Sequence, residues 1–186
     1  TIDAEEAERL DLSLDIIEVL AAADTLFANG WQGFGMALQA YQKRAAPLVD
    51  WVVALARRHN RRLMVRLVKG AYWDSEIKLS QVGGYRDYPV FTRKVATDVS
   101  YLACAAKLLN AEDAIYPAFA THNAYTIGAV KALMIPRAAL LTPNAPEAAA
   151  LTGLVVETTD DLRRAGEALL ALGAKAALMK GGHVPG

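Results

Sequence analysis

The sequence lacks the features that define several classes of protein. Its 186 residues contain one cysteine, Cys104, which excludes an internal disulfide framework and predicts a reducing, cytoplasmic location. No signal peptide is visible, and no apolar run reaches the roughly 20 residues that a membrane-spanning helix needs. Twenty basic residues balance twenty acidic ones. This balance argues against a nucleic-acid-binding module and against a basic helix at a membrane surface.

Short apolar segments instead alternate with longer helical patterns along the chain. Strands are expected at 33–41, 62–70, 114–122, 138–144 and 175–182. Apolar residues at three- and four-residue steps predict helices at 3–23, 47–60, 88–110 and 159–173, and Asp3 is expected to cap the first of them. This order predicts an α/β fold of parallel strands with helical crossovers. We expect all five strands to share one curved sheet.

The second strand candidate, RLMVRLVKG, carries two cations at an unusual place. Side chains alternate along a strand, so Arg66 and Lys69 face opposite sides, with Lys69 at the tip. An arginine within a sheet needs an anion or a polar partner, and a core carboxylate is one possibility. Ligands of such folds collect at the carboxyl ends of the strands. Polar residues follow other strands at the same edge, namely Gln39, Thr121, His122 and Asn123.

Several segments from residue 1 to about 130 resemble the proline dehydrogenase domain of the bifunctional proline-utilisation flavoenzymes. The most specific are RLVKGAYWD and ATHNA. The resemblance implies a variant (βα)8 barrel that holds FAD at the carboxyl ends of its strands. It also implies oxidation of L-proline to 1-pyrroline-5-carboxylate, with electrons passed to a membrane quinone. The resemblance further implies a cytoplasmic location, with the peripheral association with the inner membrane that is expected for the parent family.

The same resemblance assigns roles to individual residues. Arg66 matches the arginine beside the reactive edge of the flavin, Lys69 and Tyr72 match catalytic-site residues, and Asp3 matches an aspartate near the substrate. The residues implied to bind the cofactor are Gln39, Arg66, Lys69, Gly70, Ala71, Trp73, Thr92, Arg93, Lys94, His122 and Asn123. No metal site is predicted in this part of the chain.

From about residue 131 the sequence resembles another family, the hydroxymethylpyrimidine (phosphate) kinases of the ribokinase superfamily. The segments TPNAPEA and MKGGH carry this resemblance. It implies ATP and Mg²⁺, with Asn144 and Glu147 near the phosphates and Lys180 beside the nucleotide. Each has a plainer interpretation, because Glu147 suits the first turn of a helix and Lys180 the solvated end of a strand.

Two domains are therefore expected, a partial barrel at 1–130 and a partial βαβ segment of kinase type at 131–186. Both families are represented only in part. The arginine pair that holds the proline carboxylate has no counterpart after residue 130, and the kinase's glycine-rich anion hole would lie beyond residue 186. Three interpretations stay open: a flavoenzyme fragment, a pyrimidine kinase, and a chimeric α/β scaffold without native activity.

Overall fold

The computed structural model describes residues 1–3 and 6–181 of the chain. It divides into two compact units, Thr1–Thr126 and Ile127–Gly186. The first contains the strands β1 (Gly35–Gln39), β2 (Leu63–Val68) and β3 (Ile115–Phe119), the helices α1 (Leu10–Ala22), α2 (Ala45–Arg58), α3 (Trp73–Val82) and α4 (Lys94–Leu109), and the 3-10 turns Ala7–Arg9 and Asp24–Gly30. Helix α5 (Ala124–Met134) begins in the first unit and continues into the second.

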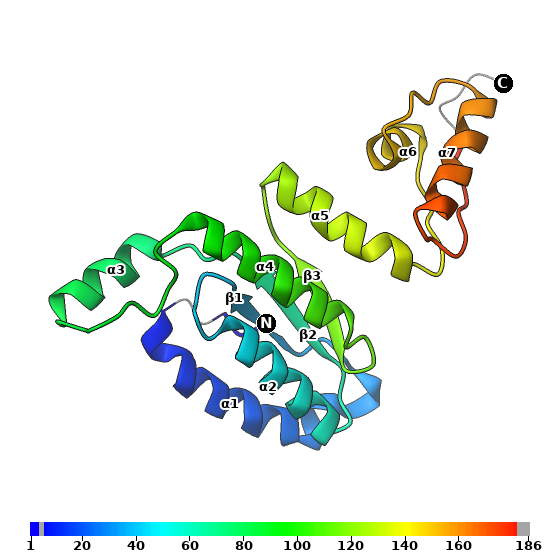
Figure 1. Cartoon of the computed structure of the whole chain (residues 1–186). Coiled ribbons are helices and arrows are strands. Elements are labelled where there is room, and N and C mark those ends of the chain that lie inside the picture. The colour runs from blue at the N-terminus through cyan, green and yellow to red at the C-terminus, as the bar shows by residue number, and fades with distance from the viewer. Residues whose placement is uncertain (4–5, 182–186) are drawn as a thin grey trace. The chain divides into compact units, whose positions relative to one another are not determined.

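The three strands form one parallel sheet in the order β1-β2-β3. Leu63, Val65 and Leu67 of β2 are buried on the face that packs against helices, and α2 and α4 lie side by side over that face, with α1 outside α2 (Figure 1). Arg66 points to the opposite face and is exposed. The expected parallel α/β architecture is confirmed, and the alternation along β2 leaves one face of the sheet for polar side chains.

The amino-terminal segment extends the sheet beyond β1. Ile2 donates to Gly35 O at 2.8 Å and accepts from Ala37 N at 2.9 Å, which forms a parallel bridge to Met36. The expected role of Asp3 as a helix cap is wrong, because α1 begins at Leu10 after a 3-10 turn. Asp3 follows the bridge to β1, and its side chain pairs with a residue of the sheet.

Helices α3 and α4 also differ from the sequence expectation. The helix predicted from residue 88 begins only at Lys94, because Pro89 and Phe91 use their backbone groups in another way. Pro89 O accepts from Lys43 N at 2.9 Å, and Phe91 N donates to Tyr41 O at 2.8 Å. Helix α3 was not predicted. Apolar and polar residues are not separated onto opposite faces of this helix, so the sequence lacks the helical pattern used for prediction. Its buried residues, Glu76 and Ser80, are polar.

The second unit contains the 3-10 turn Ile135–Arg137, α6 (Ala145–Thr152) and α7 (Thr159–Ala171). The segments predicted as its strands pair with each other in parallel, through the isolated bridges Leu141–Ala177 and Asn144–Lys180. Among the described residues these segments do not join the three-stranded sheet, so the expected single five-stranded sheet is wrong. The part of the 175–182 prediction that falls on residue 182 lies outside the described residues.

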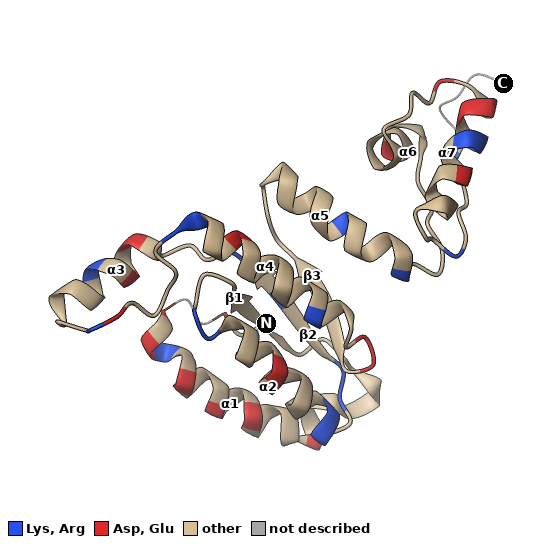
Figure 2. Ribbon diagram, viewed as in Figure 1, with Lys and Arg blue, Asp and Glu red and all other residues tan. Residues whose placement is uncertain are grey.

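The charged residues of α1 are all acidic, whereas α2 carries Asp50 and ends with Arg57 and Arg58, and Figure 2 shows this division in red and blue. Several cross-element ion pairs join charged side chains, for example Arg44 with Asp11 at 2.6 Å and Arg58 with Glu18 at 2.8 Å, which link α1 to α2. Within the described ranges, no helix is both long enough and apolar enough to cross a membrane. The single cysteine, Cys104, is buried in α4, and burial raises the pKa of its thiol.

Candidate functional site at the carboxyl ends of the strands

A cavity of about 740 Å³ lies where the three strands end. Its wall contains most of the residues that the sequence singled out, Thr121 among them, together with Val68, Phe119 and Ala120. The predicted residues that line it are Asp3, Gln39, Arg66, Lys69, Gly70, Ala71, Tyr72, Lys94, His122 and Asn123. Because parallel strands present their carboxyl ends at one edge, residues more than a hundred positions apart meet here.

Arg66 reaches this cavity from the open face of the sheet. Its neighbours in register are Ala37 on β1 and Ala118 on β3, whose small side chains leave room for the guanidinium. The guanidinium donates to the Asp3 carboxylate, which the amino-terminal bridge brings to the same face. The two side chains are 44% and 40% exposed, so water and a ligand can reach the pair. Arg66 therefore has a carboxylate partner, but one outside the core.

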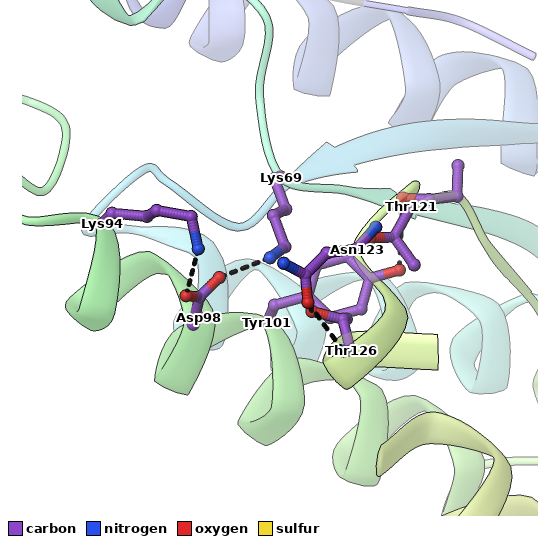
Figure 3. A network of polar contacts seen from close by, with 8 residues as sticks. Lys69, Lys94, Asp98, Tyr101, Thr121, Asn123 and Thr126 are labelled. Carbon is purple, nitrogen blue, oxygen red and sulfur yellow. Dashed lines mark hydrogen bonds and ion pairs between the residues drawn. The ribbon is translucent and has the colours of Figure 1, made fainter. Parts of the chain in front are cut away.

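Lys69 and Lys94 share a single carboxylate, that of Asp98 on α4 (Figure 3). Lys69 donates to Asp98 Oδ1, and Lys94 donates to Oδ2 at 2.7 Å. Hydrogen bonds from Lys69 first and Lys94 second hold the pKa of Asp98 below its ordinary value of 3.8. Sequence reasoning missed Asp98, although its position four residues after Lys94 in a predicted helix was a usable signal.

The backbone at Gly70 requires glycine. Its φ is +126°, and a Cβ there would lie 2.5 Å from Cδ1 of Tyr41. The chain can therefore turn away from β2 and pass close against the tyrosine ring only without a side chain. This turn places Gly70 and Ala71 in the cavity wall, where backbone groups can approach a ligand closely.

The THN segment after β3 combines cavity lining with local structure. Asn123 Oδ1 accepts from Thr126 N at 3.0 Å and from Thr126 Oγ1 at 3.2 Å, and Asn123 N donates to Thr121 Oγ1 at 3.2 Å (Figure 3). These bonds satisfy backbone donors at the beginning of α5. His122 between them is exposed and lines the cavity. Gln39 is buried at the end of β1, on the same face as Arg66.

A second cavity of about 350 Å³ adjoins the first and shares Lys69, Gly70 and Lys94 with it. Its remaining wall is largely aromatic and contains Tyr41, Trp73, Phe91, Thr92 and Thr97. Trp73 Nε1 donates to Phe91 O at 2.8 Å, which fixes the indole against this segment. Arg93 lines neither of the two cavities and occupies the position before α4.

In the second unit, Asn144, Glu147 and Lys180 lie close together. Asn144 Oδ1 accepts from Glu147 N, and Glu147 Oε2 accepts from Asn144 N, both at 2.9 Å, so the two residues form a capping box at the beginning of α6. Lys180 Nζ lies 3.7 Å from Glu147 Oε2. A cavity of about 450 Å³ beside them is lined by Glu147 and Lys131 among mostly apolar residues. The capping box by itself accounts for Asn144 and Glu147.

No cluster of three acidic, histidine or cysteine side chains suited to a metal ion occurs in residues 1–3 and 6–181. The candidate site in the first unit is therefore organised by cations, a glycine turn and polar strand ends. Such an arrangement suits a ligand with anionic and planar parts.

Comparison with known proteins supports this interpretation of the first unit. The profile of the family described as proline dehydrogenase matches residues 1–177. The chain is 60% identical over 129 residues to the bifunctional protein PutA of Salmonella typhimurium, a match that covers 69% of this chain and 10% of that protein. The chain thus spans about a tenth of the length of the curated relatives it matches first.

A solved structure of proline utilization A (PutA), with proline bound in remote sites, is similar to 95% of this chain and 17% of its own, with a TM-score of 0.70 and 48% identity. A different match concerns the hydroxymethylpyrimidine/phosphomethylpyrimidine kinase of Bacillus subtilis. It is 32% identical over 116 residues and covers 62% of this chain and 38% of the kinase. That match is longer than the segment 131–186 from which the kinase resemblance was inferred.

Proposed function

Because the chain belongs to the proline dehydrogenase family, we propose that its larger cavity binds FAD and serves the oxidation of L-proline to 1-pyrroline-5-carboxylate. The observation that carries this proposal is the convergence of Arg66, Lys69 and the Gly70 turn at the carboxyl ends of neighbouring strands. A membrane quinone as electron acceptor and a cytoplasmic location belong to the same proposal, and the buried free thiol of Cys104 is compatible with a reducing compartment.

The residues present fit a flavin dinucleotide. The volume of about 740 Å³ lies within the range of small-molecule sites, roughly 300–1,000 Å³. Lys69 and Lys94 supply positive charge for the diphosphate, and Gly70 and Ala71 let backbone approach the ligand without steric obstruction. The aromatic wall of the adjoining cavity, with Trp73 and Thr92, offers a flat apolar surface.

FAD held by these residues would supply a hydride acceptor for the oxidation of the substrate carbon. The protein's part is electrostatic and positional. Arg66 is permanently charged, so it lowers the free energy of negative charge that develops nearby during reduction. Asp3 accepts a hydrogen bond from the guanidinium and so restricts its orientation. We propose that Gln39 and His122 orient the ring system from the ends of β1 and β3, and that Tyr72 forms a side wall for the substrate.

The proposal is tested by titrating the full chain with FAD and following flavin fluorescence. We expect Arg66→Ala to weaken FAD binding by roughly tenfold to a hundredfold, which is the range for a hydrogen bond to a charged group. Arg57→Ala is the matched control, because Arg57 forms a surface ion pair with Asp113, at a distance of 2.9 Å, and neither residue lines the cavity. The proposal fails if the unchanged chain does not bind FAD, or if both variants lose affinity equally.

A second candidate function rests on the kinase match and on the proximity of Lys180 to Glu147. We propose a domain boundary near residue 130, with ATP and Mg²⁺ bound by 131–186 for phosphorylation of hydroxymethylpyrimidine. ATP-dependent formation of the phosphorylated pyrimidine, abolished by Lys180→Ala but not by Lys175→Ala, would support it. If neither FAD binding nor phosphorylation is detected, the chain is a chimeric scaffold without native activity.

A further inference from the structure

Asp98 is the only carboxylate that the described structure places against two cations of the cavity wall. Its Oδ1 accepts from Lys69, which leaves the end of β2, and its Oδ2 accepts from Lys94, in the first turn of α4 (Figure 3). Asp98 itself is not part of the wall of either cavity, whereas both lysines line both cavities. The carboxylate therefore stands behind the two cations with respect to any ligand.

The two lysines differ in how much the rest of the protein restrains them. The side chain of Lys69 is 22% exposed, and that of Lys94 is 71% exposed. A lysine has a flexible four-carbon stem, so an exposed ammonium group without a partner samples many positions. Asp98 lies on α4 at 24% exposure, and its short side chain has fewer rotatable bonds than that of Lys94. Its carboxylate can thus fix both ammonium groups before a ligand arrives.

We propose that Asp98 is a positioning residue that holds Lys69 and Lys94 as a preformed pair for the anionic part of the ligand bound between the two cavities. This inference deepens the proposed function, because it takes FAD as that ligand. Asp98 does not touch the ligand and acts only through the two lysines. By positioning the lysines, Asp98 strengthens binding of the anion. Its negative charge by itself would weaken that binding, because an acid beside an anion site repels the anion.

The substitution Asp98→Asn separates these two effects. The amide is nearly the same size as the carboxylate, and its loss of charge makes the cavity wall more positive by one elementary charge. Simple attraction would then strengthen FAD binding. The positioning role predicts the reverse, a loss of roughly tenfold or more, because two charge-assisted hydrogen bonds are weakened. Asp98→Glu keeps the charge and should recover part of the affinity.

The matched control is Asp50→Asn. Asp50 lies on α2 and accepts hydrogen bonds at 2.6 Å and 2.5 Å from Lys107, which is on α4 like Asp98. This pair is exposed and lies outside both cavities. The substitution Asp50→Asn likewise removes one negative charge and weakens one contact between a carboxylate and a lysine. We expect no change in FAD affinity for this variant, whereas Asp98→Asn and Asp50→Asn should change thermal stability by similar small amounts.

A second measurement does not depend on flavin. Trace labelling with acetic anhydride, read by mass spectrometry, reports how readily each lysine reacts, and a lysine held against a carboxylate reacts slowly. Asp98→Asn should raise the labelling rates of Lys69 and Lys94 several-fold and leave that of Lys107 unchanged. Asp50→Asn should raise that of Lys107 alone.

Each outcome decides something. Faster labelling of both lysines together with weaker FAD binding supports the inference. Faster labelling with equal or tighter FAD binding overturns it, because the carboxylate then acts only as a repelling charge. Unchanged labelling of Lys69 overturns it at the level of geometry. If the unchanged chain does not bind FAD, the proposed function fails, and the labelling result still decides whether Asp98 restrains the two lysines.

Discussion

Gly70 lies against the ring of Tyr41, so close that a Cβ on the glycine would be 2.5 Å from the ring atom Cδ1. The contact joins the turn after β2 to the segment after β1. It fixes the path of the chain into the cavity wall, and it couples the stability of the fold to the shape of the candidate site.

We expect Gly70→Ala to destabilise the protein by more than a glycine replacement in open space. Gly84→Ala is the comparison, because Gly84 has a φ of +63° and nothing within 4 Å of the position of a Cβ. Gly84→Ala should cost about 1 kcal/mol for the left-handed backbone alone. Gly70→Ala should exceed that by about 1–3 kcal/mol because of the clash. Urea unfolding measures both, and equal losses would show that the tyrosine ring moves aside freely.

A second prediction concerns Tyr101, which is buried on α4 beneath the ends of two strands. Its hydroxyl lies 3.3 Å from Leu67 O and 3.4 Å from Ala120 O and can donate to these backbone acceptors. Tyr101→Phe removes that donor and should lower the free energy of unfolding by about 1 kcal/mol. Tyr125→Phe, at a position that is 73% exposed, should have no measurable effect.

The same tyrosine predicts a dependence on alkaline pH. Burial raises the pKa of Tyr101 from 10.0 to about 12. The folded state therefore keeps a proton that the unfolded state loses, so this contribution to stability is complete below pH 10 and is lost as the pH rises toward 12. Between pH 9 and pH 11, on the order of one unit either side of the pKa of a free tyrosine, the free energy of unfolding should fall more steeply with pH for the unchanged chain than for Tyr101→Phe. An equal dependence on pH in both proteins would contradict a raised pKa of Tyr101 in the folded state.

The capping box of α7 provides a third prediction, for the second unit. Thr158 Oγ1 accepts from Asp161 N at 3.2 Å, and Asp161 Oδ2 accepts from Thr158 N at 2.9 Å. Thr158→Ala should cost about 1 kcal/mol, as for other caps, and Thr159→Ala is the neighbouring control.

The cap also depends on acid pH. Hydrogen bonds from Thr158 and then Arg164 hold the pKa of Asp161 far below its ordinary value of 3.8. The stabilisation is present above that value and is lost as the pH falls below it. In Thr158→Ala, NMR titration of the carboxyl groups should show that the titration midpoint of Asp161 has moved toward the ordinary pKa. An unchanged midpoint would mean that Arg164 alone determines it.

The last prediction concerns turnover. We expect this chain alone to show no reduction of a dye acceptor that depends on L-proline, because the proposed function already assigns the described arginine and lysines of the cavity wall, Arg66, Lys69 and Lys94, to FAD. Arg163 and Arg164 pair with acids of their own helix α7. No further lysine or arginine is then left in the described wall to anchor a substrate carboxylate. Turnover that Arg66→Ala abolishes would overturn this expectation, and a flavin-free sample is the blank.

Much of the site could be predicted from the sequence because it depends on chain order and on strand geometry. A strand with Arg66 and Lys69 at its end has to deliver both cations to the carboxyl edge of a parallel sheet, and the THN segment after β3 reaches the same edge. Most residues of the two most specific segments lie together in one cavity wall, whereas Trp73 lines the adjoining cavity. Their roles toward FAD and proline remain proposals.

Only the tertiary structure decided which residues pair across the site. Asp3 reads as a helix cap in the sequence, yet the bridge of Ile2 to β1 brings it to Arg66. Asp98 reads as one more polar position of a helix, and packing of α4 beside β2 brings it to Lys69. Strand formation in the second unit was also decided there, since apolar segments become strands only where enough backbone partners are available. Local patterns follow from neighbours in the chain, whereas ion pairs and sheet membership depend on contacts between residues far apart in sequence.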